Sequence, residues 1–100
     1  MTDYFKVAWH HQIPEEPTVL YSEVTDGWEV RKVEAYRDGR MDVASGSLQT
    51  GTTFLSETPF PAIEEIGRDP QFTPESISRD EFEVVWRQAV GAQGAGDGLS

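Results

Sequence analysis

Hydrophobic and polar side chains alternate along the first part of the chain in the way that is typical of β-strands. Phe5, Val7 and Trp9 take one side of the first segment, with Lys6 and His10 on the other. The alternation predicts strands over four segments: Tyr4 to His11, Val19 to Val24, Trp28 to Tyr36 and Arg40 to Ser45.

Two Asp-Gly dipeptides separate the last three of these segments. Asp26-Gly27 and Asp38-Gly39 suit the left-handed angles of two-residue type I′ turns, so the three strands should form an antiparallel meander. Two such turns would fix the strand pairing at both ends of the third strand. The expected pairs are Thr25 with Trp28 and Arg37 with Arg40.

This pairing leaves two interpretations of the meander faces open, and a strand register other than the expected one would remove both. In the first, the core is the face that carries Tyr21, Trp28, Val30, Tyr36, Met41 and Val43, because aromatic side chains contribute the most buried area. In the second, the core is the opposite face, whose side chains are smaller, and the aromatic face is open and interleaved with charges, as in a binding surface. The residues expected to bind a partner are then Tyr21, Glu23, Trp28, Lys32, Glu34 and Tyr36.

The second half of the chain predicts two helices. Residues 46–53 resemble a loop, Phe54-Leu55 suits a short strand or a packed turn, and Pro61 suits the first position of a short helix that ends at Ile66. Ser78 and Glu81 form a capping box. It is followed by apolar residues on one helical face, namely Phe82, Val85, Trp86 and Ala89.

The expected fold class is therefore α+β, an antiparallel β-meander of about four strands with two helices packed on one face. Gly91 should end the last helix, which leaves residues 1–90 as one domain and 91–100 as a disordered, Gly-rich tail.

Composition narrows the range of partners. The 100 residues include 18 Asp and Glu against 8 Lys and Arg, a formal net charge of −10, which disfavours nucleic acid and anionic membranes. A basic protein partner would be attracted. There is no cysteine, no apolar stretch long enough to span a bilayer and no signal peptide, so a cytoplasmic location is expected.

Candidate chemistry is sparse. His10 and His11 are neighbours on a strand and point to opposite faces, so they do not suit one metal ion while the strand is regular. The local acid pairs, such as Glu64-Glu65, are typical of solvated faces and helix N-termini. We expect no catalytic residue, no metal and no cofactor.

Several motifs resemble those of a family of short, uncharacterised bacterial proteins. They are Val7-Ala8-Trp9-His10-His11, Leu20-Tyr21-Ser22-Glu23, the run from Trp28 to Arg40, and Glu81-Phe82-Glu83-Val84-Val85-Trp86. The likeness covers about residues 4–90. It implies a stand-alone bacterial cytoplasmic domain of unknown function and carries over no catalytic residue.

Two functions are expected from the sequence. The first is a non-enzymatic, acidic protein-interaction module, in one version an immunity-type protein that neutralises a basic toxin. The alternative is a small-molecule-binding or hydrolytic domain that uses His10, His11 and carboxylates near the Pro14–Pro17 loop. Partner identity and oligomeric state are not specified by the sequence.

Overall fold

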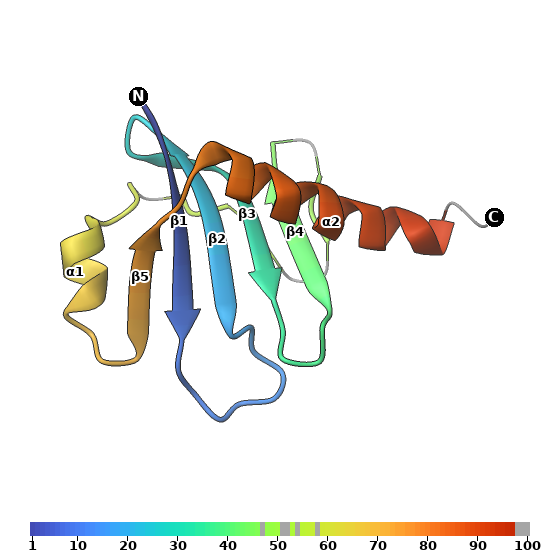
Figure 1. Cartoon of the computed structure of the whole chain (residues 1–100), viewed down its shortest axis with the longest axis horizontal. Helices are drawn as coiled ribbons and strands as arrows, with labels where there is room; N and C mark the ends of the chain where they lie inside the picture. Colours follow the sequence, from blue (N-terminus) through green and yellow to red (C-terminus); the bar gives the residue numbers. More distant parts are fainter. Residues whose placement is uncertain (47, 51–52, 54, 58, 98–100) are drawn as a thin grey trace.

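The chain folds into a five-stranded antiparallel sheet with two helices (Figure 1). The computed structural model describes residues 1–46, 48–50, 53, 55–57 and 59–97; for residues 93–97 it describes the backbone alone. The elements in chain order are β1 (Thr2–Trp9), β2 (Val19–Thr25), β3 (Trp28–Ala35), β4 (Met41–Ser45), α1 (Ile63–Gly67), β5 (Phe72–Ser76) and α2 (Arg79–Asp97).

The strands lie in the order β4-β3-β2-β1-β5. The first four therefore form the expected antiparallel meander, and the α+β fold class is confirmed. The fifth strand was not predicted: β5 returns to pair antiparallel with β1, so that β1 lies inside the sheet. β5 contains Pro74, which is tolerated because this strand is at the edge of the sheet.

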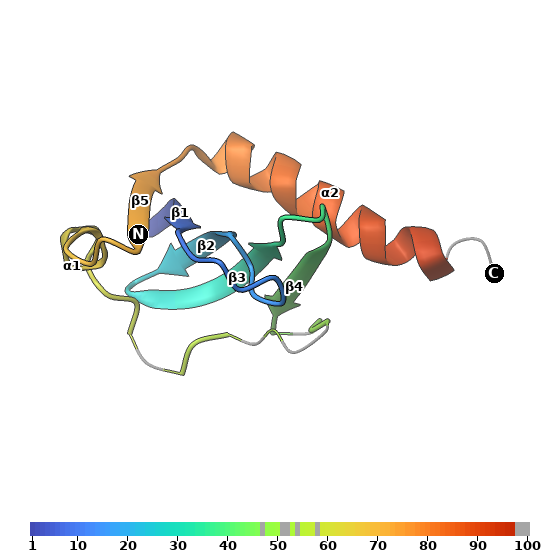
Figure 2. The ribbon, with the colours of Figure 1, turned by 90° about the horizontal axis from the view of Figure 1, so that it is seen from below.

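Helix α2 packs across one face of the sheet and closes the core there (Figure 2). The backbone N–H of Glu81 donates to Oγ of Ser78 at 3.1 Å, which confirms the predicted N-cap. Phe82 and Ala89 are fully buried on the predicted helical face. The centre of the core consists of Val33, Val43 and Ala89, with Tyr21, Met41, Val85, Trp86 and Val90 packed against it.

The predicted end of this helix is wrong. α2 continues from Gly91 to Asp97, and Figure 1 shows its C-terminal end projecting beyond β4. Each Gly costs a helix only about 1 kcal/mol relative to Ala, and the three glycines of this segment, Gly91, Gly94 and Gly96, alternate with the better helix formers Ala92, Gln93 and Ala95. The last three residues of the predicted tail lie outside the described residues.

The described residues between β4 and α1 lie along the sheet face opposite α2 (Figure 2). Helix α1 then packs against β5 and begins at Ile63, with Ala62 as N-cap, so Pro61 precedes the helix instead of opening it. Of the predicted Phe54-Leu55 pair, Phe54 lies outside the described residues. Both sheet edges are covered, β5 by α1 and β4 by residues 48–50, which limits edge-to-edge association.

The first hairpin has the predicted turn but an unpredicted irregularity after it. Asp26 and Gly27 have φ angles of +53° and +87°, and Thr25 pairs with Trp28 as expected. The pairing then shifts: Val24 lies opposite Glu29, whereas Glu23 lies opposite Arg31. Val30 is thus the extra residue of a β-bulge, and the faces of β3 beyond it are exchanged.

The second hairpin differs from its prediction. Ala35 pairs with Met41, and the N–H of Tyr36 donates to the carbonyl of Arg40, so the loop contains three residues, from Arg37 to Gly39. Gly39 takes a φ of +94°, as in a type I turn followed by a left-handed residue. The expected pair Arg37 with Arg40 is wrong by one position.

The pairing departs from the predicted register once on each side of β3, and together the two departures leave the relative faces of β2 and β4 as predicted. Tyr21 of β2 and Val43 of β4 still share a face, as predicted, but they share it with Val33 and not with Lys32 and Glu34. The face under α2 is the core, and in β3 it carries Arg31, Val33 and Ala35. The side chains of β3 beyond the bulge therefore point to the face opposite the predicted one, whereas those of β2 and β4 point to the predicted faces.

Candidate functional site: a pocket on the sheet face opposite α2

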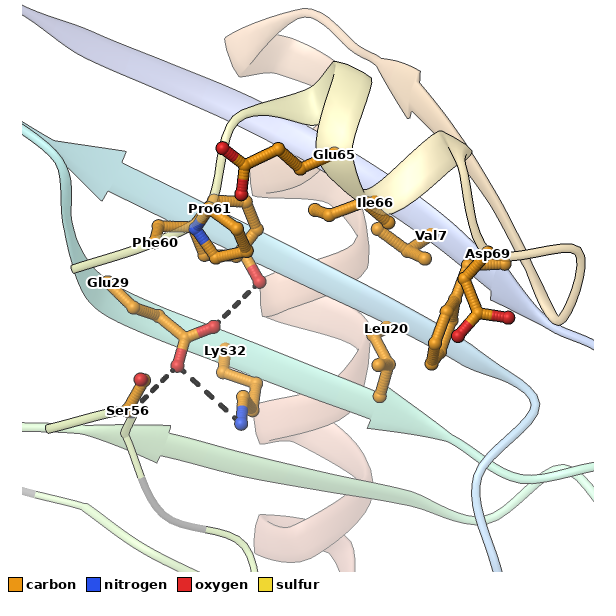
Figure 3. Close-up of a pocket in the computed structure, with 12 residues that line it drawn as sticks. Val7, Leu20, Glu29, Lys32, Ser56, Phe60, Pro61, Glu65, Ile66 and Asp69 are labelled. Carbon is orange, nitrogen blue, oxygen red and sulfur yellow. Dashed lines mark hydrogen bonds and ion pairs between the residues drawn. The ribbon is translucent and has the colours of Figure 1, made fainter. Parts of the chain in front are cut away.

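A pocket of about 450 Å³ lies between the sheet and the connection that leads into α1 (Figure 3). The bulge at Val30 helps to form it, because it moves Lys32 to the face opposite α2, where Glu29 and Ser22 already lie. The full lining consists of Val7, Leu20, Ser22, Glu29, Lys32, Ser56, Phe60, Pro61, Glu65, Ile66, Asp69 and Phe72.

One end of the pocket is polar and centred on the carboxylate of Glu29. Ser22 donates its hydroxyl to Oε2 of Glu29 at 2.7 Å, and the backbone N–H of Ser56 donates to Oε1 at 3.0 Å. The ammonium of Lys32 lies 3.5 Å from the same Oε1. The Glu29 side chain is only 2% exposed, so these donors supply the compensation that a buried carboxylate needs.

The other end is apolar, and Asp69 lies beside it (Figure 3). Val7, Leu20 and Ile66 come together there from three different elements, as Figure 3 shows. Asp69, whose Oδ1 accepts the backbone N–H of Gln71 at 2.9 Å, lies at this end, while the exposed Glu65 projects from α1. An apolar cavity with a few fixed polar groups is the usual form of a binding site.

Carboxylates of this face also hold the connection in place. Besides the contact of Glu29 with Ser56, the hydroxyl of Thr53 donates to Glu34, and that of Thr50 donates to Oδ1 of Asp42 at 3.0 Å. Phe60 stacks on Phe5 of β1 with ring centroids 5.4 Å apart. The lining residues Ser56 and Phe60 are thus held to β3 and β1, and neighbouring residues of the connection are held to β3 and β4.

The six residues expected to form one partner surface do not share a face. Tyr21 and Glu23 lie on the α2 side, and Lys32 and Glu34 lie on the opposite side. Tyr36 is buried, beneath the guanidinium of Arg40, whereas Trp28 is 49% exposed at the hairpin end. Their grouping as one surface is therefore wrong, because it assumed the unshifted pairing. The role of each residue in partner binding stays a prediction.

Glu23 instead belongs to an ionic cluster beneath α2. Arg31 lies 2.6 Å from Glu23 and 2.7 Å from Glu83 of α2, and its guanidinium lies over the rings of Phe82 and Trp86. Hydrogen bonds from Arg31 lower the pKa values of Glu23 and Glu83, and the two carboxylates raise the pKa of Arg31. Such a cluster fixes the helix on the sheet.

The two histidines are engaged in local structure. His10 shares a hydrogen bond of 2.7 Å with Thr73 of β5. His11 donates from Nε2 to the carbonyl of Pro17 and accepts the N–H of Ile13 at Nδ1, which holds the turn between β1 and β2. Neither is among the described residues that line the pocket. The described residues contain no group of three or more metal-ligating side chains and no helix long and apolar enough to cross a membrane.

Comparison with known proteins identifies the family. The model of a family described as a domain of unknown function (DUF6881) matches residues 3–91. The chain belongs to this family. No curated protein and no solved structure matches it. The predicted resemblance to an uncharacterised family is confirmed, and membership in DUF6881 assigns no activity to the pocket.

The pocket itself was not predicted from the sequence. Leu20 and Ser22 were placed on one face correctly, and the predicted pairing of Thr25 with Trp28 keeps Glu29 on that face, but Lys32 joined them only through the bulge. Ile66 was predicted to be buried on its short helix, with no indication that it would face Leu20. The spacing between these segments carries no such information.

Proposed function

We propose that this protein is a non-enzymatic interaction module that binds a basic protein partner. The observation that carries the proposal is the distribution of charge: two partly buried basic residues are neutralised within the fold, whereas most of the acids are exposed. Arg31 and Lys32 are only 20% and 19% exposed and are paired with Glu23, Glu83 and Glu29.

The exposed acids come from every part of the fold. They are Asp3, Glu15, Glu16, Asp26, Asp38, Glu57, Glu64, Glu65, Glu75, Asp80 and Glu81. The exposed basic residues are fewer, namely Arg37, Arg40, Arg68, Arg79 and Arg87. A surface of this kind accelerates encounter with a positively charged protein and repels polyanions. An immunity-type protein that neutralises a basic toxin is one such module.

The test is capture of a partner by the immobilised full chain at low and high salt. We expect a basic protein to be retained at about 50 mM salt and released at about 500 mM, because screening shortens the range of charge attraction. A purified partner should then bind in a fixed stoichiometry. Absence of any basic protein at low salt, or retention that salt does not change, contradicts the proposal.

Trp28 is the first contact to test. Its ring is half exposed, so Trp28→Ala should change the free energy of unfolding by less than about 1 kcal/mol while it weakens partner binding. Phe82→Ala serves as the control, since Phe82 is fully buried and its truncation should cost about 3–5 kcal/mol. A large loss of stability in Trp28→Ala would show that Trp28 supports the fold.

Binding of a small molecule is a second candidate, favoured by the pocket. Its volume of about 450 Å³ lies within the range of ligand sites. The hydrolytic version, which uses His10 and His11, has no comparable geometric support among the described residues. The two candidates, a protein partner and a small molecule, are distinguished by which kind of compound binds in the pocket.

A further inference from the structure

We propose that the pocket opposite α2 receives one large apolar side chain of a protein segment in which lysine or arginine flanks that side chain. The proposal rests on the proposed function and deepens it, because it assigns the recognition site and the sequence chemistry of the partner. It involves binding alone and no covalent step.

The apolar end of the pocket determines the central side chain. Val7, Leu20 and Ile66 provide aliphatic walls, and Phe60 and Phe72 provide aromatic ones. A volume of about 450 Å³ admits an aromatic or long aliphatic group. Its burial would remove apolar surface from water on both partners, which is the usual source of affinity at an anchor residue.

The charged residues of the lining determine the flanking charge. Inside the pocket the negative charge of Glu29 is matched by the positive charge of Lys32, 3.5 Å away. The exposed Glu65 and the partly exposed Asp69 add two negative charges to the lining, so the lining as a whole favours a cation beside the apolar group and disfavours an anion.

The acidic character extends past the pocket, which favours a polypeptide as the occupant. Glu64 and Glu57 are exposed and adjoin the lining residues Glu65 and Ser56, against one exposed cation, Arg68, which adjoins the lining residue Asp69. A free amine would reach only the carboxylates of the lining. A segment with basic residues on both sides of its apolar anchor would also reach these outer carboxylates, since each residue of an extended chain spans about 3.3 Å.

The experiment is amide NMR of the full chain titrated with three synthetic peptides. They are acetylated and amidated Gly-Lys-Phe-Lys-Gly, the same peptide with Ser in place of Phe, and the same peptide with Glu in place of both Lys. The first peptide should change the amide chemical shifts of Val7, Leu20 and Ile66, and these changes should saturate as the peptide concentration rises. The other two should bind at least tenfold more weakly.

Two variants and a matched control test the site. Leu20→Phe should fill the apolar end and weaken the first peptide at least tenfold. Glu65→Lys should weaken it about three- to tenfold, whereas Glu81→Lys should leave binding within twofold. Both glutamates are exposed and lie in the first turn of a helix, so the two charge changes have similar local costs, but Glu81 is on α2 across the sheet.

Several results would overturn the assignment. The first is that the amide chemical-shift changes fall on residues away from the pocket. The second is that the Lys-Phe-Lys and Glu-Phe-Glu peptides bind equally well. Phenethylamine binding as tightly as the first peptide would assign the pocket to a small cation instead. A basic partner that is captured equally by wild type and Leu20→Phe refutes the pocket assignment and leaves the proposed function standing. If the first peptide binds in the pocket but the immobilised chain captures no basic protein, the proposed function is refuted and the pocket assignment is not.

Discussion

Arg31 joins the sheet to α2 through two carboxylates and two aromatic rings. Its side chain is 20% exposed, so removal leaves Glu23 and Glu83 without their main compensating charge in a partly buried setting. We expect Arg31→Met to lower the free energy of unfolding by about 2–3 kcal/mol. Arg79 is the matched control: it lies 3.9 Å from the same Glu83 but is 75% exposed, so Arg79→Met should cost less than about 0.5 kcal/mol. Denaturant unfolding measures both, and equal losses would contradict this account.

The same residue makes stability depend on pH. Hydrogen bonding to Arg31 is the main cause that lowers the pKa of Glu23 below its usual 4.5. The stabilisation is therefore complete above the pKa of the unfolded chain and is lost as the pH falls through the lower folded value. The difference in unfolding free energy between wild type and Glu23→Gln should be constant near neutral pH and shrink below about pH 4.5. In an Arg31→Met background this pH dependence should largely disappear; its persistence would assign the pKa shift to another group.

Among the elements, those specified by neighbouring residues were predicted and those specified by distant contacts were not. The Asp26-Gly27 turn and the Ser78 cap depend on local chemistry, and both are confirmed. The bulge at Val30 has no local cause, since Arg31 gains Glu23 and Glu83 only when the strand is shifted. β5 was missed because it is short, contains Pro74 and depends on β1 for its pairing. The pocket combines both failures, which is why its residues were not recognised as a set.

The three-residue hairpin loop is testable through its glycine. Gly39 has a φ of +94°, where a side chain is strained, so Gly39→Ala should destabilise the protein by about 1 kcal/mol. Gly46 is the control, because an added Cβ would contact nothing within 4 Å at either position but only Gly39 has a positive φ. Gly46→Ala should be neutral or slightly stabilising, through its effect on the unfolded chain. Equal effects of the two substitutions in thermal unfolding would contradict the loop geometry.

For the whole molecule, the acidic surface that favours a basic partner also acts against the folded state. With a net charge of −10, folding brings like charges together, and added salt should relieve their repulsion. Between about 10 mM and 200 mM NaCl the screening length falls from about 30 Å to below 10 Å, so the free energy of unfolding at pH 7 should rise by roughly 1 kcal/mol. In the double variant Glu15→Lys, Glu16→Lys each exchange replaces a negative charge by a positive one, which changes the net charge from −10 to −6 and should reduce the salt dependence. Stability that falls with salt in the wild type would show that internal pairs such as Arg31–Glu23 outweigh the surface repulsion.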